Sequence, residues 1–280
     1  MGAMGFLARR FVAGERAEDA IRVGEALGAR GIRATFDLLG EDVHSEDTAR
    51  RSARACQDLL RAIPASVERN ISIKLSMMGL DVQPELAREL AGDVVRTARE
   101  CGGFVRIDME GSAHTQRILD VFHDLRREFD NVGIVLQAYL HRTEKDVREA
   151  IERGDRVRLC KGAYKEPPEI AWTDMKDVRD SFRRLARLLL EHGRYPAIAT
   201  HDESLIQDAT AFAREKGIAA SRFEMQMLYG LRRRRWDELV AAGHNVRIYV
   251  PYGTHWLPYF YRRLRERKEN VFFVLKNLFD

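Results

Sequence analysis

The chain has 280 residues, 45% of them hydrophobic and 32% charged, a composition typical of a globular protein with a large buried core. The net charge is only +4 and acidic residues accompany an excess of arginine, so we expect an interspersed salt-bridging surface and not a nucleic-acid-binding stripe. No apolar run approaches the ~20 residues of a membrane-spanning helix, no cleavable signal pattern begins the chain, and neither the three cysteines nor the eight histidines have metal-binding spacing. These features predict a cytoplasmic protein without a metal site.

Short β-rich runs alternate with amphipathic helical patterns along the chain, after an expected N-terminal helical segment in residues 1–30. One helical pattern, residues 83–103, has a proline in its first turn, and another begins after the capping pair Thr173/Asp174 and ends at Gly193. A third covers residues 45–63. The runs expected as strands are residues 32–41, 71–80, 104–110, 132–140, 156–164, 195–202, 222–230 and 246–253.

Eight strand–helix units in series predict a parallel sheet, and eight is the number that closes a barrel. We therefore expect an α/β fold, a (βα)8 TIM-type barrel in residues 31–280. A doubly wound open sheet is the alternative, but no strand is followed by GxGxxG. In such a barrel we expect apolar residues in the interior and the chemistry at the carboxyl ends of the strands.

Polar residues recur where the predicted strands end. A charge that faces the barrel must be paired or solvated in a site, because leaving it buried alone costs several kcal/mol. Each residue also has a structural explanation: a strand-end aspartate often caps or pairs, and a glutamine or histidine often bonds to backbone. Their recurrence at one end of successive strands favours a site. The residues are Lys74, Asp108, Gln137, Arg158 with Lys161, Thr200 with His201, Glu224 with Gln226, and Tyr249.

Two further runs carry chemical information. In "RLCKGAY", Lys161, Gly162 and Ala163 follow a strand and offer free backbone N–H groups beside a cation, which suits a phosphate or a flat ring, although a tight βα turn explains the run equally well. "LRRRRW", residues 231–236, is the one basic block. It is typical of a solvated helix face, and the alternative is an anionic partner or membrane headgroups.

The helical pattern that begins at Pro258 has an unusual face. Tyr259, Arg262, Arg263 and Glu266 occupy positions i, i+3, i+4 and i+7, where a surface helix normally has its apolar stripe. The pattern therefore places two cations, a carboxylate and a phenol on the side that should pack inward.

These runs resemble the proline dehydrogenase family, flavin enzymes that oxidise L-proline to Δ1-pyrroline-5-carboxylate. The similar motifs extend from Asp37 to Asn270 in the family's order: "DLLGE", "IKLS", "RIDME", "RLCKGAY", "ATHD", "FEMQMLYG" and "YVPYG" followed by "RRL" and "ER". The resemblance implies a distorted (βα)8 barrel with FAD at the carboxyl ends of the strands and the last helix over the barrel mouth. It also implies hydride transfer from proline to flavin N5, a quinone as electron acceptor, and peripheral contact with the inner face of the membrane.

The resemblance also assigns residues. Arg262, Arg263 and Lys74 would bind the substrate carboxylate, because arginine forks match carboxylates bidentately. Glu266 and Asp108 would hold these cations, and Tyr249 and Tyr259 would form pocket walls. Arg158 would lie near flavin N5, and with Asp108 would make up the catalytic pair. The positions that would line FAD are Met109, Gln137, Arg158, Lys161, Gly162, Ala163, Tyr164, Thr200 and His201. One departure is Asp202 in "ATHD", where many members have Asn.

Two other functional classes remain as alternatives. A barrel aldolase would use Lys74 or Lys161 as a Schiff-base nucleophile, but the sequence offers no late glycine pair for a phosphate, and the charged face after Pro258 would be unexplained. An arginine-rich nucleic-acid binder would retain DNA with a steep salt dependence.

Overall fold

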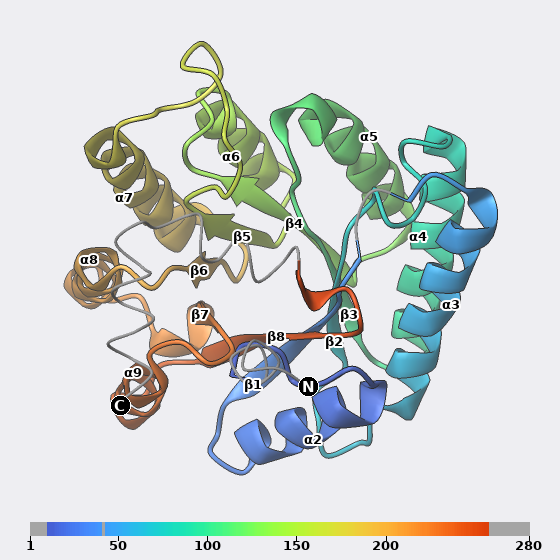
Figure 1. Cartoon of the computed structure of the whole chain (residues 1–280). Helices are drawn as coiled ribbons and strands as arrows, with labels where there is room; N and C mark the ends of the chain where they lie inside the picture. The colour runs from blue at the N-terminus through green and yellow to red at the C-terminus, as the bar shows by residue number, and fades with distance from the viewer. Residues whose placement is uncertain (1–9, 41–42, 258–280) are drawn as a thin grey trace.

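The computed structural model describes residues 10–40 and 43–257. Its eight parallel strands follow chain order around a closed barrel, which β1 completes by pairing with both β2 and β8. Figure 1 shows the helices arranged around these strands. The predicted (βα)8 barrel is confirmed, and the doubly wound alternative is wrong. The strands are β1 (Arg33–Leu38), β2 (Asn70–Ile73), β3 (Phe104–Ile107), β4 (Val132–Gln137), β5 (Val157–Cys160), β6 (Ala197–Ala199), β7 (Glu224–Leu228) and β8 (Val246–Tyr252).

The helices begin and end where the sequence carries the expected signals. Pro84 is the first residue of its helix, Asp174 accepts a hydrogen bond from the Lys176 N–H, and Gly193 follows the last residue of the same helix. The helix expected from Pro258 lies outside the described residues. The described helices are α2 (Ala17–Gly28), α3 (Glu46–Ala62), α4 (Pro84–Glu100), α5 (Ser112–Glu128), α6 (Thr143–Glu152), α7 (Met175–His192), α8 (Glu203–Glu215), the 3₁₀ turn η1 (Ala220–Arg222) and α9 (Arg233–Ala241).

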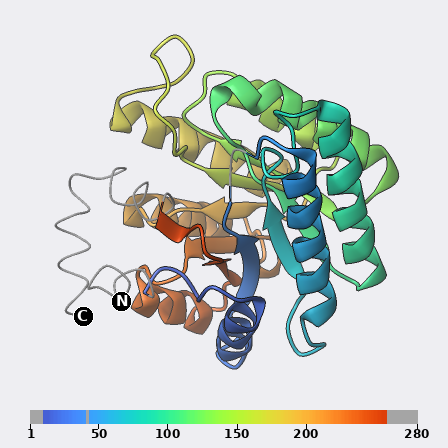
Figure 2. The same ribbon diagram turned by 45° about the vertical axis from the view of Figure 1, so that its right-hand side comes forward.

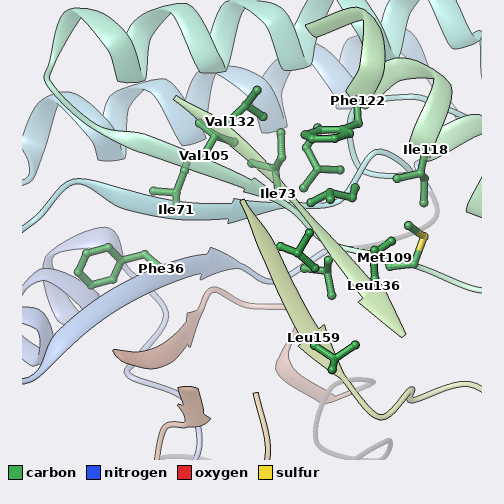
Figure 3. Close-up of a cluster of buried hydrophobic side chains, with 14 of the residues drawn as sticks. Phe36, Ile71, Ile73, Val105, Met109, Ile118, Phe122, Val132, Leu136 and Leu159 are labelled. Carbon is green, nitrogen blue, oxygen red and sulfur yellow. The ribbon is translucent and has the colours of Figure 1, made fainter. Parts of the chain in front are cut away.

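The apolar core lies between the strands and the helices that cover them. Ile73, Val105 and Phe122 are fully buried there, as Figure 3 shows. The long helices α3, α4 and α5 lie side by side outside β2, β3 and β4 (Figures 1 and 2). Because successive strand residues point to opposite faces, the residues between these apolar positions must point into the barrel.

The expectation of an apolar barrel interior is wrong. Asp108 bonds to Arg158, which is on β5, and to Tyr249, which is on β8. Neither strand neighbours β3 in the sheet, so these side chains can meet only inside the barrel. The charges tolerate this burial because they are paired. The buried polar residues that lie on the strands or directly after them are Thr35, Asp37, Asn70, Ser72, Lys74, Arg106, Asp108, Gln137, Arg158, Thr200, Glu224, Gln226 and Arg247.

Glu224 and Gln226 do not lie with the other polar residues at the carboxyl ends, so their predicted placement is wrong. Glu224 is the first residue of β7, and its carboxylate accepts from the Arg247 Nε at 3.0 Å near the start of β8. Arg247 also bonds to Glu68 at 2.9 Å and to the Ala34 carbonyl at 2.8 Å, and Gln226 donates to Glu224. These residues form an ion-paired network at the amino end of the barrel.

Three of the four arginines of the basic block "LRRRRW" form ion pairs with acidic neighbours. Arg232 and Arg235 both bond to Glu203, and Arg234 and Arg235 both bond to Glu238. The block therefore behaves as a salt-bridged helix face. No helix of residues 10–40 and 43–257 has the length and hydropathy needed to span a bilayer.

Candidate active site

Four of the predicted site residues form one buried cluster at the carboxyl ends of the strands. Asp108, directly after β3, accepts from the Arg158 Nη1 and from the Tyr249 hydroxyl, both at 2.8 Å. The Lys74 ammonium, directly after β2, lies 3.9 Å from the Asp108 carboxylate and 3.5 Å from the Tyr249 hydroxyl. The structure thus brings Lys74, Asp108, Arg158 and Tyr249 together from four different strands.

Asp37 is a member of this cluster that sequence reasoning did not single out. Its carboxylate accepts from the Lys74 ammonium at 2.9 Å, and its side chain is 1% exposed. Burial raises the pKa of Asp37, while the charge of Lys74 opposes the rise. A signal was present: Asp37 lies in the motif "DLLGE" and points to the same face of β1 as Thr35.

Arg158 has donors that the described residues do not use. Its Nη1 binds Asp108 and the Ser72 hydroxyl at 3.1 Å, and its guanidinium lies 5.4 Å from the centre of the Tyr249 ring. Its Nε and Nη2 are buried and have no hydrogen-bond partner among residues 10–40 and 43–257. A buried guanidinium with open donors is costly unless another group accepts from it, so this position suits a bound anion or electron-rich ring.

A second group of predicted residues adjoins the cluster on strands β4 and β5. The Gln137 amide reaches the Met109 carbonyl at 3.5 Å, while its oxygen has no partner among the residues the structure describes. Gly162 has a φ of 123°, and a Cβ there would lie 2.2 Å from the Tyr139 ring. Only glycine fits this turn. The next residues, Ala163 and Tyr164, are partly exposed. This lining fits a flat cofactor.

Lys161 is held by a carboxylate from the next strand–helix unit. Its ammonium lies 3.2 Å from Asp202, which also accepts from Arg179 at 2.8 Å and caps α8 through Ser204. Burial acts to raise the pKa of Asp202, but the bonds from Arg179 and Ser204 and the charge of Lys161 hold it below its ordinary value. Asp202 thus ion-pairs with Lys161 and Arg179 in a way that an asparagine would not.

Thr200 and His201 lie at the end of β6, as predicted. Thr200 is 4% exposed, and its hydroxyl accepts from the Asp202 N–H at 3.1 Å. The His201 Nε2 lies 2.9 Å from the Leu228 N–H, so this nitrogen is an acceptor and the ring is neutral in that bond. Both residues are therefore fixed by backbone contacts at the same rim of the barrel. The remaining predicted residues, Tyr259, Arg262, Arg263 and Glu266, lie outside the described part of the chain.

A closed βα barrel with charged side chains gathered inside the carboxyl ends of its strands is the arrangement of a barrel enzyme. The two lysines do not favour the aldolase alternative, because Lys74 and Lys161 are both ion-paired to carboxylates, whereas a Schiff-base lysine must be uncharged to attack. The particular family follows from comparison with known proteins.

The family model described as proline dehydrogenase matches residues 20–276. The chain is 40% identical over 272 residues to proline dehydrogenase 1 of Bacillus subtilis strain 168, covering 97% of this chain and 90% of that protein. It is 38% identical over 281 residues to the proline dehydrogenase of Deinococcus radiodurans, with the same coverage. A similar solved structure is proline utilization A from Bdellovibrio bacteriovorus inactivated by N-propargylglycine, with a TM-score of 0.86 and 27% identity over 95% of this chain and 33% of that one. The chain belongs to the proline dehydrogenase family and is an oxidoreductase of proline catabolism.

Proposed function

We propose that this chain uses FAD to oxidise L-proline to Δ1-pyrroline-5-carboxylate and passes the electrons to a quinone. The observation that carries the proposal is the buried Arg158, which is fixed by Asp108 and Ser72 and keeps two donors without partners among the described residues. Preorganised donors of this kind stabilise negative charge that develops on a bound group. When bound, FAD would accept the hydride, and its reduced ring carries the negative charge that Arg158 would stabilise.

The residues that would hold the cofactor are those of the second group. Gly162 allows close approach of the ring system, the Gln137 oxygen can accept a hydrogen bond, and the Lys161 cation suits the diphosphate. Met109, Ala163, Tyr164, Thr200 and His201 would complete the lining. These roles rest on the resemblance to the family, supported by the location of these side chains at one rim of the barrel.

The remaining residues would bind and orient proline. Lys74, Arg262 and Arg263 would bind its carboxylate, and Tyr249 and Tyr259 would wall the ring. Asp37 and Asp108 hold Lys74 and Arg158 in place, and Glu266 would do the same for the arginine pair. Fixing the carboxylate at one end of a five-membered ring fixes the position of the carbon that is oxidised, which is how orientation lowers the barrier.

Transfer of the electrons to a quinone, and peripheral contact with a membrane, are proposed from the resemblance alone. Three of the four arginines of residues 231–236 are ion-paired to Glu203 or Glu238, which reduces the positive charge that this block could offer to a membrane surface. Sedimentation with anionic vesicles tests the membrane contact. If the protein stays in the supernatant, the electron acceptor would be a soluble molecule and not a membrane quinone.

The decisive experiment is an absorption spectrum of the purified protein before and after addition of L-proline. We expect a yellow protein with a band near 450 nm that bleaches under anaerobic conditions. D-Proline is the matched control, since its carboxylate cannot be held in the same orientation. Incubation with N-propargylglycine, the compound that inactivates the Bdellovibrio relative, should block the bleaching, and L-proline should protect against it. A colourless protein that oxidises proline, or a yellow one that proline does not reduce, would refute the proposal.

Replacing Arg263 with alanine should lower kcat/KM for proline at least about thirtyfold, mainly through KM. The reason is that truncating one partner of a buried, charged hydrogen bond costs about 2–5 kcal/mol. Steady-state kinetics with a soluble quinone analogue measures this. The control is Arg61→Ala, because Arg61 is an exposed arginine on α3 that pairs with Asp58. A loss below threefold for Arg263→Ala would reject its role in binding the carboxylate.

A further inference from the structure

The long connection between β5 and α7, residues 161–174, carries the proposed cofactor-binding residues Lys161–Tyr164 and projects beyond the ring of helices (Figures 1 and 2). Its two ends are attached to the connection after β4. The Tyr139 N–H donates to the Lys161 carbonyl, and the Trp172 N–H donates to the Tyr139 carbonyl, both at 2.8 Å. The Trp172 ring also packs edge-on against His141 at 4.4 Å. The His141 N–H donates to the Ile170 carbonyl at 2.9 Å, and the His141 Nε2 lies 2.8 Å from the Pro168 carbonyl. The contacts to the connection after β4 thus reach from Trp172 back to Pro168, and a further attachment lies between Lys161 and Pro168.

Glu166 supplies this attachment. Its carboxylate accepts from the Ser112 backbone N–H at 2.7 Å and from the Ser112 hydroxyl at 2.5 Å. Ser112 is the first residue of α5, and the preceding Gly111 has no side chain with which to cap the helix. The first N–H groups of a helix lack intrahelical partners and favour negative charge. The Glu166 carboxylate, which belongs to a loop distant in sequence, therefore caps the amino end of α5.

The same arrangement occurs one strand–helix unit earlier. Glu110 is 5% exposed, and its carboxylate accepts from both the backbone N–H and the hydroxyl of Ser76, the N–H bond being 3.0 Å long. Ser76 lies two residues beyond Lys74, and Glu110 lies two residues beyond Asp108. Glutamate–serine contacts thus join the connections after β2, β3 and β5, each immediately beyond residues of the candidate site.

We propose that Glu166 is a positioning residue that fixes Lys161–Tyr164 for cofactor binding by tying their loop to the start of α5. The inference rests on the proposed function, since it assigns the cofactor to this loop. The conformation of Gly162 explains why the contact between Glu166 and Ser112 matters. Its φ of 123° belongs to a region that glycine samples freely. Residues 162–164 can therefore rearrange unless the residues that follow them, up to Glu166, are fixed. Holding such a loop in its bound conformation removes an ordering cost from binding.

The test compares Glu166→Ala with Glu169→Ala, the same substitution at an exposed glutamate on the same loop. Purified holoenzyme is diluted, and FAD release is followed by the recovery of flavin fluorescence. We expect Glu166→Ala to release FAD roughly tenfold faster or more, because charge-assisted hydrogen bonds are about twice as strong as neutral ones. Glu169→Ala should match the parent. Glu166→Gln should be intermediate, since its amide oxygen can still accept from the Ser112 N–H.

Hydrogen exchange of residues 161–166 gives a second readout that does not depend on activity. The exchange should accelerate in Glu166→Ala and stay at the parent's rate in Glu169→Ala. Equal FAD release and equal exchange in the two variants would overturn the proposal. If Glu166→Ala does not fold, Glu166→Gln and Ser112→Ala decide it by the same two measurements. If the parent itself holds no FAD, the proposed function fails, whereas the exchange rates still report whether Glu166 fixes the loop.

Discussion

Replacing Asp108 with alanine should lower kcat/KM for proline by about a thousandfold. The carboxylate accepts from Arg158 and Tyr249 at 2.8 Å and lies 3.9 Å from the Lys74 ammonium. Its loss leaves the buried Arg158 guanidinium with the Ser72 hydroxyl as its remaining hydrogen-bond partner among the described residues. Truncating one member of a buried charge pair costs about 2–5 kcal/mol, and here three partners are affected at once, so we expect the upper part of that range.

Stopped-flow bleaching of the flavin by proline measures the effect directly. Tyr249→Phe is the graded comparison, because it removes one of the bonds to Asp108 and leaves the pair with Arg158 intact. The loss of kcat/KM in Tyr249→Phe should be clearly smaller than that in Asp108→Ala. Asp180→Ala, which removes an exposed aspartate from α7, is the control and should be within twofold of the parent. An Asp108→Ala variant that contains FAD and stays within threefold of the parent would contradict the assignment.

The alternation of short β-rich runs with helical patterns was sufficient to predict the barrel. Each parallel strand needs a crossover to reach its neighbour, and eight such units close the sheet. Capping signals located the helices equally well: Pro84 begins α4 and Asp174 caps α7, as predicted. These signals are local, so a single sequence contains them.

The depth of a residue within the barrel could not be predicted in the same way. Alternation shows to which face Glu224 and Gln226 point, but not how far along the barrel they lie. Their depth depends on register, which pairs Glu224 with Ala197 and Gln226 with Arg247 across strands that a helix separates in the chain. The sequence offered "FEMQMLYG" as one run, and the strand begins at Glu224. Glu224, which the sequence analysis grouped with the polar residues at the strand ends, therefore belongs to the ion-paired network at the amino end of the barrel.

The charge balance of the interior also required the three-dimensional arrangement. The sequence predicted Lys74 and Asp108 in the site, yet the bond that neutralises Lys74 comes from Asp37 on another strand. The sequence placed Arg158 in the site, yet its partners Asp108 and Ser72 lie on or directly after other strands, and the acceptors of Arg247 are likewise brought to it by the fold. The apolar residues instead fill the space between strands and helices, where parallel strands bury their other face.

The second large effect concerns stability. Glu224→Gln should lower the free energy of unfolding by about 3 kcal/mol, because it leaves the fully buried Arg247 with Glu68 as its remaining carboxylate. For a domain of this size, such a loss lowers Tm by roughly 6–12 °C. Thermal unfolding followed by circular dichroism at pH 7, at equal FAD concentrations, measures it. Asp58→Asn, which breaks an exposed pair with Arg61 on α3, is the matched control and should shift Tm by no more than a degree or two.

The difference in Tm between the parent and Glu224→Gln should disappear in acid. The reason is the direction of the pKa shift of Glu224, which follows from the groups around its carboxylate. Burial acts to raise the pKa of Glu224, but the charge and hydrogen bond of Arg247, the Gln226 amide and the Arg106 charge together hold it at about 2, against 4.5 ordinarily. The folded state therefore binds the proton less tightly than the unfolded state does. This difference contributes about 3 kcal/mol above pH 4.5, and the contribution is lost as the pH falls through about 2.

Other carboxyls titrate in the same range, so the informative quantity is the difference between parent and variant at each pH. Asp37 acts in the opposite direction, because burial raises its pKa above 3.8 and protonation then favours the folded state. It is present in both proteins and cancels. The gap in Tm between parent and variant should therefore narrow steadily from pH 4.5 and nearly close at pH 2. Because glutamate and glutamine have nearly the same size, a gap that is constant down to pH 2 would mean that the hydrogen-bonding pattern of the carboxyl group, and not its charge, stabilises the amino end of the barrel.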